Sequence, residues 1–180
     1  VSRSAPAAHN GSVRDRNETP FMAIHVRTGK GSSFQDPLRH HSPEEMAQFI
    51  NCSLSLHESW MQKCNYEAPP KIYVAADQSS IKEEFVKAHP SLMRTAADVE
   101  VLHIERSRPN EIHEMVKAYD NVWAELKILA DSTCLIASKS TFSDLGEDFH
   151  PTQLFPRRCS VQFNDCDSDR IEEALNAVVC

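Results

Sequence analysis

The chain has 180 residues, of which 41% are hydrophobic, so it fits a single domain with a buried core. A net charge of −7 and a pI near 5.7 disfavour a general nucleic-acid-binding protein, which needs a basic surface to neutralise phosphates. No run approaches the ~18 uninterrupted apolar residues of a membrane-spanning helix, so we expect neither a nucleic-acid partner nor a membrane span.

Residues 1–20 are polar and are expected to form an irregular arm, without the apolar segment of an intact signal peptide. The arm carries two N-x-[ST] glycosylation acceptors, Asn10 and Asn17, and a third acceptor, Asn51, lies further along the chain. Together with an even number of cysteines, these acceptors favour the secretory pathway, in the Golgi or endoplasmic reticulum lumen or outside the cell. A cytosolic protein with reduced thiols is the alternative.

The cysteines lack the C-x-x-C spacing of zinc ribbons and predict disulfides rather than a metal site. They are Cys52, Cys64, Cys134, Cys159, Cys166 and Cys180. Six cysteines allow 15 pairings, and the spacing does not choose among them. Cys159 and Cys166 are close enough to bridge over a short loop, while Cys134, in an apolar run, is equally compatible with a buried thiol. Cys180 either ties down the tail or links two chains.

Residues 21–180 alternate between strand-like and helix-like segments. Strands are expected at 21–28, 71–76, 99–104, 134–138 and 159–163, and helices at about 43–62, 80–89, 110–131 and 168–178. Ser42, Ser80, Asn110 and Ser168 are the expected N-terminal caps. The alternation predicts an α/β, Rossmann-like domain with a parallel sheet of about five strands and helices on both faces.

The helix over 110–131 has an apolar stripe at helical spacing, which predicts that this face belongs to the core. The stripe consists of Ile112, Met115, Val116, Tyr119, Val122, Trp123, Leu126 and Leu129.

Ligands of a doubly wound sheet bind outside the carboxyl ends of its strands, so the residues that follow each strand are candidates for a site. They are His25, Arg27, the loop containing Gly29, Asp77, Glu105, Arg106 and residues 138–143. A permanent cation, a glycine-containing loop, hydroxyls and an acid are groups that suit a nucleoside diphosphate. The loop is neither a Walker A sequence nor a G-x-G-x-x-G dinucleotide motif.

Three segments in order resemble the donor-binding motifs of the α-1,2-, α-1,6- and protein O-fucosyltransferases. FMAIHVRTGKG resembles the first motif, in which an apolar strand ends in His-x-Arg. KIYVAAD resembles the second motif, and LADSTCLIASKSTFSDLG resembles the third, with its Ser-Thr-Phe turn after a short strand. The resemblance covers about residues 21–149.

The resemblance implies half of a GT-B fold that binds GDP-fucose for inverting transfer to a glycan or protein acceptor, without a cofactor or metal. Arg27 and His25 would be catalytic, Arg27 by stabilising the charge on the departing GDP. The nucleotide would be bound by Gly29, Asp77, Ser140, Thr141 and Phe142.

Enzymes of this family have two such halves, and this chain has room for one. The resemblance therefore places the acceptor half in another segment or another chain, unless it is absent. The alternative function is a secreted non-transferase on the same fold, such as a lectin, a structural oligomer or a repurposed enzyme.

Overall fold

A computed structural model describes residues 20–28, 30–31, 34–35, 42–95, 112–150 and 158–180 of the chain. A five-stranded, wholly parallel sheet forms the centre of this part, in the order β5-β4-β1-β6-β7. Its strands are β1 (Met22–Val26), β4 (Ile72–Ala76), β5 (Met93–Arg94), β6 (Cys134–Ala137) and β7 (Cys159–Gln162). A short antiparallel pair, β2 (Lys30–Gly31) and β3 (Phe34–Gln35), follows β1. The expected parallel α/β architecture is confirmed.

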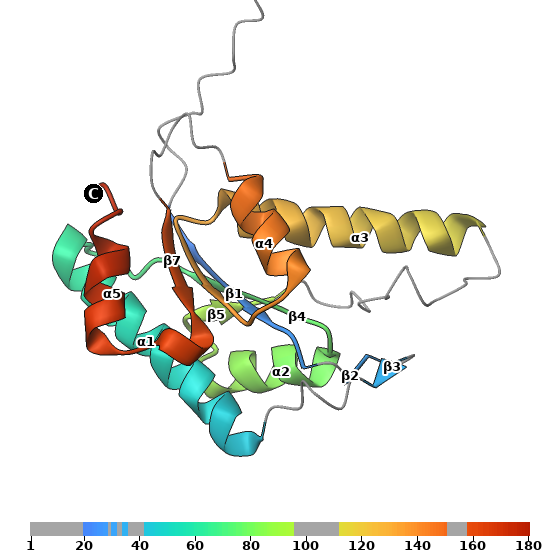
Figure 1. Cartoon of the computed structure of the whole chain (residues 1–180), viewed down its shortest axis with the longest axis horizontal. Coiled ribbons are helices and arrows are strands. Elements are labelled where there is room, and N and C mark those ends of the chain that lie inside the picture. Colours follow the sequence, from blue (N-terminus) through green and yellow to red (C-terminus); the bar gives the residue numbers. More distant parts are fainter. Residues whose placement is uncertain (1–19, 29, 32–33, 36–41, 96–111, 151–157) are drawn as a thin grey trace, which may run out of the picture.

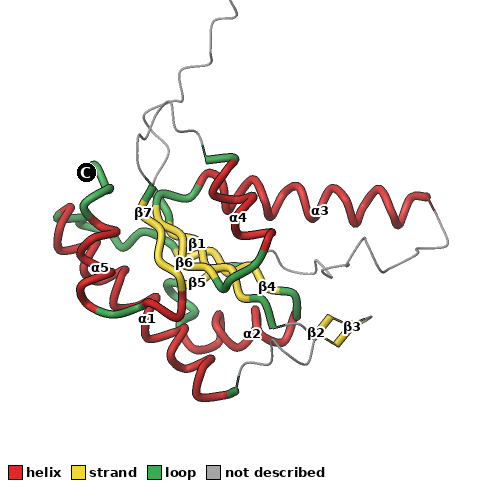
Figure 2. The backbone as a smooth tube through the Cα atoms, in the orientation of Figure 1, coloured by secondary structure: helices red, strands yellow, loops and turns green. Residues whose placement is uncertain are grey.

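Helices cover both faces of the sheet, as Figures 1 and 2 show. One face carries α1 (Pro43–Cys64), α2 (Ser79–Ala88) and α5 (Ser168–Leu175), the last preceded by a 3-10 turn at Phe163–Asp165. The other face carries α3 (Ile112–Asp131) and α4 (Thr141–Asp148).

The alternating direction of side chains along β1 explains why the sheet has a core on each face, because successive strand side chains point to opposite faces. Met22, Ile24 and Val26 belong to the larger core beneath α1, α2 and α5. Ala23 belongs to a smaller core with Leu129 of α3 and with residues of β6. His25 follows the same alternation as Ala23 and therefore lies on the α3–α4 face, near the carboxyl end of the strand.

Local signals place some helix ends correctly and others wrongly. Ser42 caps α1 as expected, accepting a hydrogen bond from Glu45 N while the Glu45 carboxylate accepts one from Ser42 N. The predicted cap at Ser80 is wrong, since α2 already begins at Ser79. The predicted cap at Ser168 is also wrong, because Asp167 caps α5 by accepting from Arg170 N. Asp167 lies one residue before Ser168, and its carboxylate accepts a hydrogen bond from the third N–H of the helix.

Two predicted features lie outside the described residues, namely the strand over 99–104 and the cap at Asn110. The strand on the side of β4 away from β1 is β5, whose Met93 pairs with Ile72 and whose Arg94 pairs with Tyr73.

The apolar stripe of α3 is only partly core, which corrects the sequence prediction. Leu126 and Leu129 are buried, whereas Val116, Tyr119 and Trp123 are 52%, 44% and 58% exposed. The reason is the length of the helix. Figure 2 shows the N-terminal part of this helix extending past the described strands.

All six cysteines form disulfides: Cys52–Cys166, Cys64–Cys180 and Cys134–Cys159. The suggested short-loop bridge between Cys159 and Cys166 is wrong, and Cys134 is not a thiol. Cys134 and Cys159 are register partners on neighbouring strands, with Cα atoms 4.5 Å apart, so the sheet itself brings them together. Cys180 ties the C-terminal tail to the end of α1.

Candidate functional site

The chain order defines a topological switch point between β1 and β6. From β1 the chain moves outward through β4 to β5, and it then returns to the other side of β1 to form β6 and β7. Connections on the two sides therefore run over opposite faces, and open α/β sheets bind ligands where this reversal occurs, at the carboxyl ends of the strands.

Six residues that the sequence singled out meet at this place, and Thr28, which it did not single out, joins them. We use the name switch-point cluster for His25, Arg27, Thr28, Asp77, Ser138, Ser140 and Ser143.

Ser138 joins the ends of the two central strands. Its backbone N–H donates to the His25 carbonyl at 2.9 Å, and its hydroxyl oxygen accepts from Arg27 N at 2.7 Å. The backbone at the start of the loop after β1 is thus attached to the end of β6. Because Arg27 and Ser138 each directly follow a strand of the sheet, the backbone position from which the Arg27 side chain extends is fixed.

Asp77, directly after β4, holds the same loop from the other side. Its Oδ1 accepts hydrogen bonds from Thr28 N at 2.9 Å and from Thr28 Oγ1 at 2.7 Å. Its Oδ2 lies 3.6 Å from Nε of Arg27. Asp77 and Thr28 are both buried, while the Arg27 side chain is 23% exposed. The structure therefore shows Asp77 orienting Arg27, and its predicted contact with guanine or ribose stays a prediction.

His25 is buried at the junction of β1 and α4. Its Nδ1 lies 2.6 Å from the Ser143 hydroxyl, and its ring stands 5.1 Å from the ring of Phe142. Burial lowers the pKa of His25 from 6.5 to about 4. The nearby positive charges of Arg27 and Lys82 lower this pKa too, whereas Asp77 opposes them. The imidazole is therefore neutral at pH 7.

The N-terminus of α4 faces the same end of the sheet. Ser140 is its cap and accepts a hydrogen bond from Phe142 N, while Thr141 occupies the first helical position and is exposed. The preceding Lys139 is also exposed. A helix N-terminus carries partial positive charge and unpaired N–H groups, so this end of α4 favours an anion.

A buried ion pair bridges the two helical layers near the cluster. Lys82 of α2 donates to Glu125 of α3 over 2.5 Å, and their side chains are 3% and 7% exposed. Burial raises the pKa of Glu125, and the charge of Lys82 opposes that rise. Neither residue was predicted, since each sits in an ordinary amphipathic pattern and their partnership spans 43 positions.

Gly29, Asn10 and Asn17, with Glu105 and Arg106, fall outside the described residues. Asn51 is exposed on α1, while Ser53, two positions later in its acceptor motif, is buried and donates to Phe49 O.

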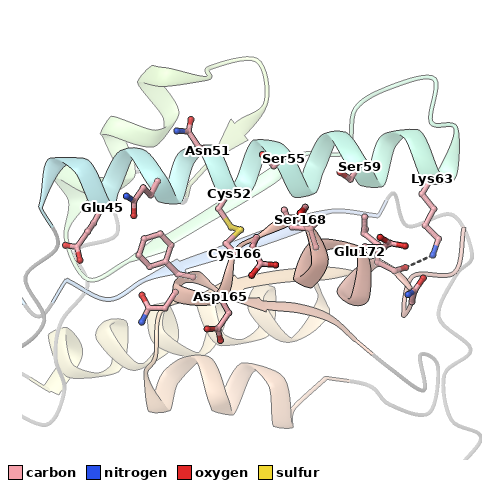
Figure 3. Close-up of a pocket in the computed structure, with 17 residues that line it drawn as sticks. Glu45, Asn51, Cys52, Ser55, Ser59, Lys63, Asp165, Cys166, Ser168 and Glu172 are labelled. Carbon is pink, nitrogen blue, oxygen red and sulfur yellow. Dashed lines mark hydrogen bonds between the residues drawn. A yellow bond between two sulfur atoms is a disulfide. The ribbon is translucent and has the colours of Figure 1, made fainter.

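A groove of about 980 Å³ lies between α1 and α5 (Figure 3). The Cys52–Cys166 disulfide crosses it, and its walls include four carboxylates, those of Glu45, Asp165, Asp167 and Glu172. Lys63 also lines it, but its ammonium donates to Leu175 O. Such a surface repels phosphate groups, so the switch-point cluster is the better candidate for a nucleotide.

Comparisons of the chain with protein-family models, with curated proteins and with solved structures gave no match. Within the described residues, no group of three or more His, Cys, Asp or Glu side chains is arranged to hold a metal ion. None of the described helices combines the length and apolar character needed to cross a membrane.

Proposed function

We propose that this chain is the donor-binding half of a fucosyltransferase-like enzyme and that it binds GDP-fucose at the switch-point cluster. The observation that carries the proposal is the position of Arg27. Arg27 directly follows the carboxyl end of the central strand at the switch point. Its side chain is partly exposed, and Asp77 orients its guanidinium. A permanent, fork-shaped cation in that place suits the diphosphate of a nucleotide sugar.

The geometry supports the diphosphate part of the proposal. Arg27 would bind the β-phosphate and stabilise the charge that develops on it as the glycosidic bond breaks. Ser140, Thr141 and the N–H groups that begin α4 would bind phosphate oxygens. The acidic groove between α1 and α5 offers no comparable environment.

The sequence resemblance supports the guanine and fucose parts. Asp77 and Phe142 would help to form the base pocket, and His25 would contact the nucleotide. Transfer also requires an acceptor half, which this domain would meet in another segment or another chain. Three disulfides are typical of oxidising compartments, and they favour the Golgi or endoplasmic reticulum lumen or the cell exterior.

Thermal unfolding with and without millimolar GDP tests this function. GDP at 100 times its Kd should stabilise the domain by ~2.7 kcal/mol, which corresponds to roughly 5–11 °C in Tm. Arg27→Ala should abolish the shift. The matched control is Arg170→Ala, because Arg170 is exposed on α5 and pairs with Glu173. ADP and UDP at the same concentration should give smaller shifts.

The absence of any GDP shift in the wild-type chain would reject donor binding and favour the secreted non-transferase. A shift that survives in Arg27→Ala would instead place the nucleotide away from the switch point.

A further inference from the structure

The contact between His25 and α4 determines which ring nitrogen of His25 carries a proton. The Ser143 hydroxyl is fully buried and lies between two groups, His25 Nδ1 at 2.6 Å and the Ser138 carbonyl oxygen at 2.9 Å. A carbonyl oxygen only accepts hydrogen bonds, so the single hydroxyl proton of Ser143 is donated to Ser138.

Because Ser143 has a single hydroxyl proton, only one assignment remains for its contact with His25 Nδ1. Ser143 Oγ has no further proton to give, and it therefore accepts from Nδ1–H of His25. The opposite tautomer would place two lone pairs 2.6 Å apart or break the bond to Ser138. Either change would leave a buried polar group unsatisfied, which is costly where water has no access.

We propose that Ser143 is a positioning residue that holds His25 as the Nδ1–H tautomer, so that Nε2 accepts a hydrogen bond from the bound nucleotide sugar. This inference rests on the proposed function for its ligand. The group that meets Nε2 must be a hydroxyl or an N–H, because a phosphate oxygen would bring two acceptors together. His25 thus recognises a donor group of the ligand, while Arg27 recognises its phosphates.

Two other buried histidines supply internal standards. His150 has Nδ1 2.7 Å from the Ala130 carbonyl oxygen, and His57 has Nε2 2.9 Å from the Pro70 carbonyl oxygen. Each of these nitrogens must carry a proton to make its bond. His57 is a reference for the Nε2–H tautomer, because burial also lowers its pKa, and His150 is a reference for a protonated Nδ1.

The first test uses the wild-type chain without nucleotide. Long-range ¹H–¹⁵N correlation spectra of the ¹⁵N-labelled protein at pH 7 distinguish protonated from unprotonated ring nitrogens, and His→Asn variants at positions 25, 57 and 150 assign the signals. His25 should show a protonated Nδ1, as His150 does, together with an unprotonated Nε2. The pattern of His57 would overturn the inference.

The second test measures GDP-fucose affinity in Ser143→Ala and Ser143→Thr. Ser143→Ala should produce a mixture of His25 tautomers and weaken binding about fivefold, the size of one hydrogen bond. Ser143→Thr keeps the hydroxyl and should restore both the tautomer and the affinity. If Ser143→Ala changes the tautomer and leaves affinity unaltered, Ser143 has no positioning role.

Failure of the wild-type chain to bind GDP-fucose would reject the proposed function and the ligand contact of His25. The tautomer measurement separates that outcome from failure of the proton assignment, because it needs no ligand.

Discussion

Acid should destabilise this domain through His25 before the bulk of its carboxylates begin to titrate. The pKa of the buried imidazole is about 4 in the folded chain and 6.5 in the unfolded chain, chiefly because burial disfavours the charged ring. Below pH 6.5 the unfolded chain therefore binds a proton that the folded chain does not. The stability that His25 contributes is complete above pH 6.5, and it is lost as the pH falls towards 4.

The difference between the two pKa values gives the size of the effect. One pKa unit corresponds to 1.36 kcal/mol, so the contribution lost between pH 6.5 and 4 is on the order of 3 kcal/mol. That is a large part of the 5–15 kcal/mol by which domains are typically stable.

Urea unfolding of the wild-type chain and of His25→Asn at pH 7, 5.5 and 4.5 measures this pH-dependent loss of stability. Asn retains an N–H that can donate to Ser143, and the cavity that it leaves costs stability at every pH. The free energy of unfolding should therefore fall more steeply with acid in the wild type than in His25→Asn. His57→Asn is the comparison, because burial lowers the pKa of His57 as well. His25 and His57 lie on opposite faces of the sheet, so the two effects should add.

Parallel pH curves for the wild type and His25→Asn would refute the reasoning. They would mean that His25 is protonated or solvated in the folded chain, and that its bond to Ser143 differs from the one described.

Two further predictions concern stability. Lys82→Met should lower the free energy of unfolding in urea by ~3–5 kcal/mol, because it leaves Glu125 buried without its partner. Lys82→Met combined with Glu125→Leu should recover most of this loss. Equal losses in the two variants would show that packing, rather than charge, matters here. Cys64→Ser combined with Cys180→Ser should lower the free energy of unfolding by ~3.5 kcal/mol. The intact Cys52–Cys166 bridge leaves roughly 26 residues in the loop that the Cys64–Cys180 disulfide closes. A loss of about 5 kcal/mol, the value for the full separation of 116 residues, would show that the two loops act independently.

The elements of the fold could be predicted because their signals are local. The apolar run of β1 and the capping box at Ser42 are each contained in a few adjacent residues, and the structure reproduces both. The parallel sheet followed from the alternation of strands and helices, since parallel strands need long crossovers. The position of Arg27 and Asp77 at one edge followed in turn, because all carboxyl ends of a parallel sheet lie together.

Local signals failed where a choice depended on neighbours in space. The stripe of α3 satisfies the helical period along its whole length, but among the described residues its C-terminal part packs on the sheet while its N-terminal part extends past the described strands. Cys134 and Cys159 pair because their strands are adjacent and in register, and no spacing rule contains that information.

The sequence by itself thus determined the α/β class, the parallel sheet and the edge at which the candidate residues gather. Only the tertiary structure decided how that edge is organised. Thr28 meets Asp77 across 49 positions, Lys82 meets Glu125 across 43, and His25 meets Ser143 across 118. Hydrogen bonds and ion pairs act over about 3 Å, and the chain brings such distant residues within that range only after the sheet and its two helical layers have assembled.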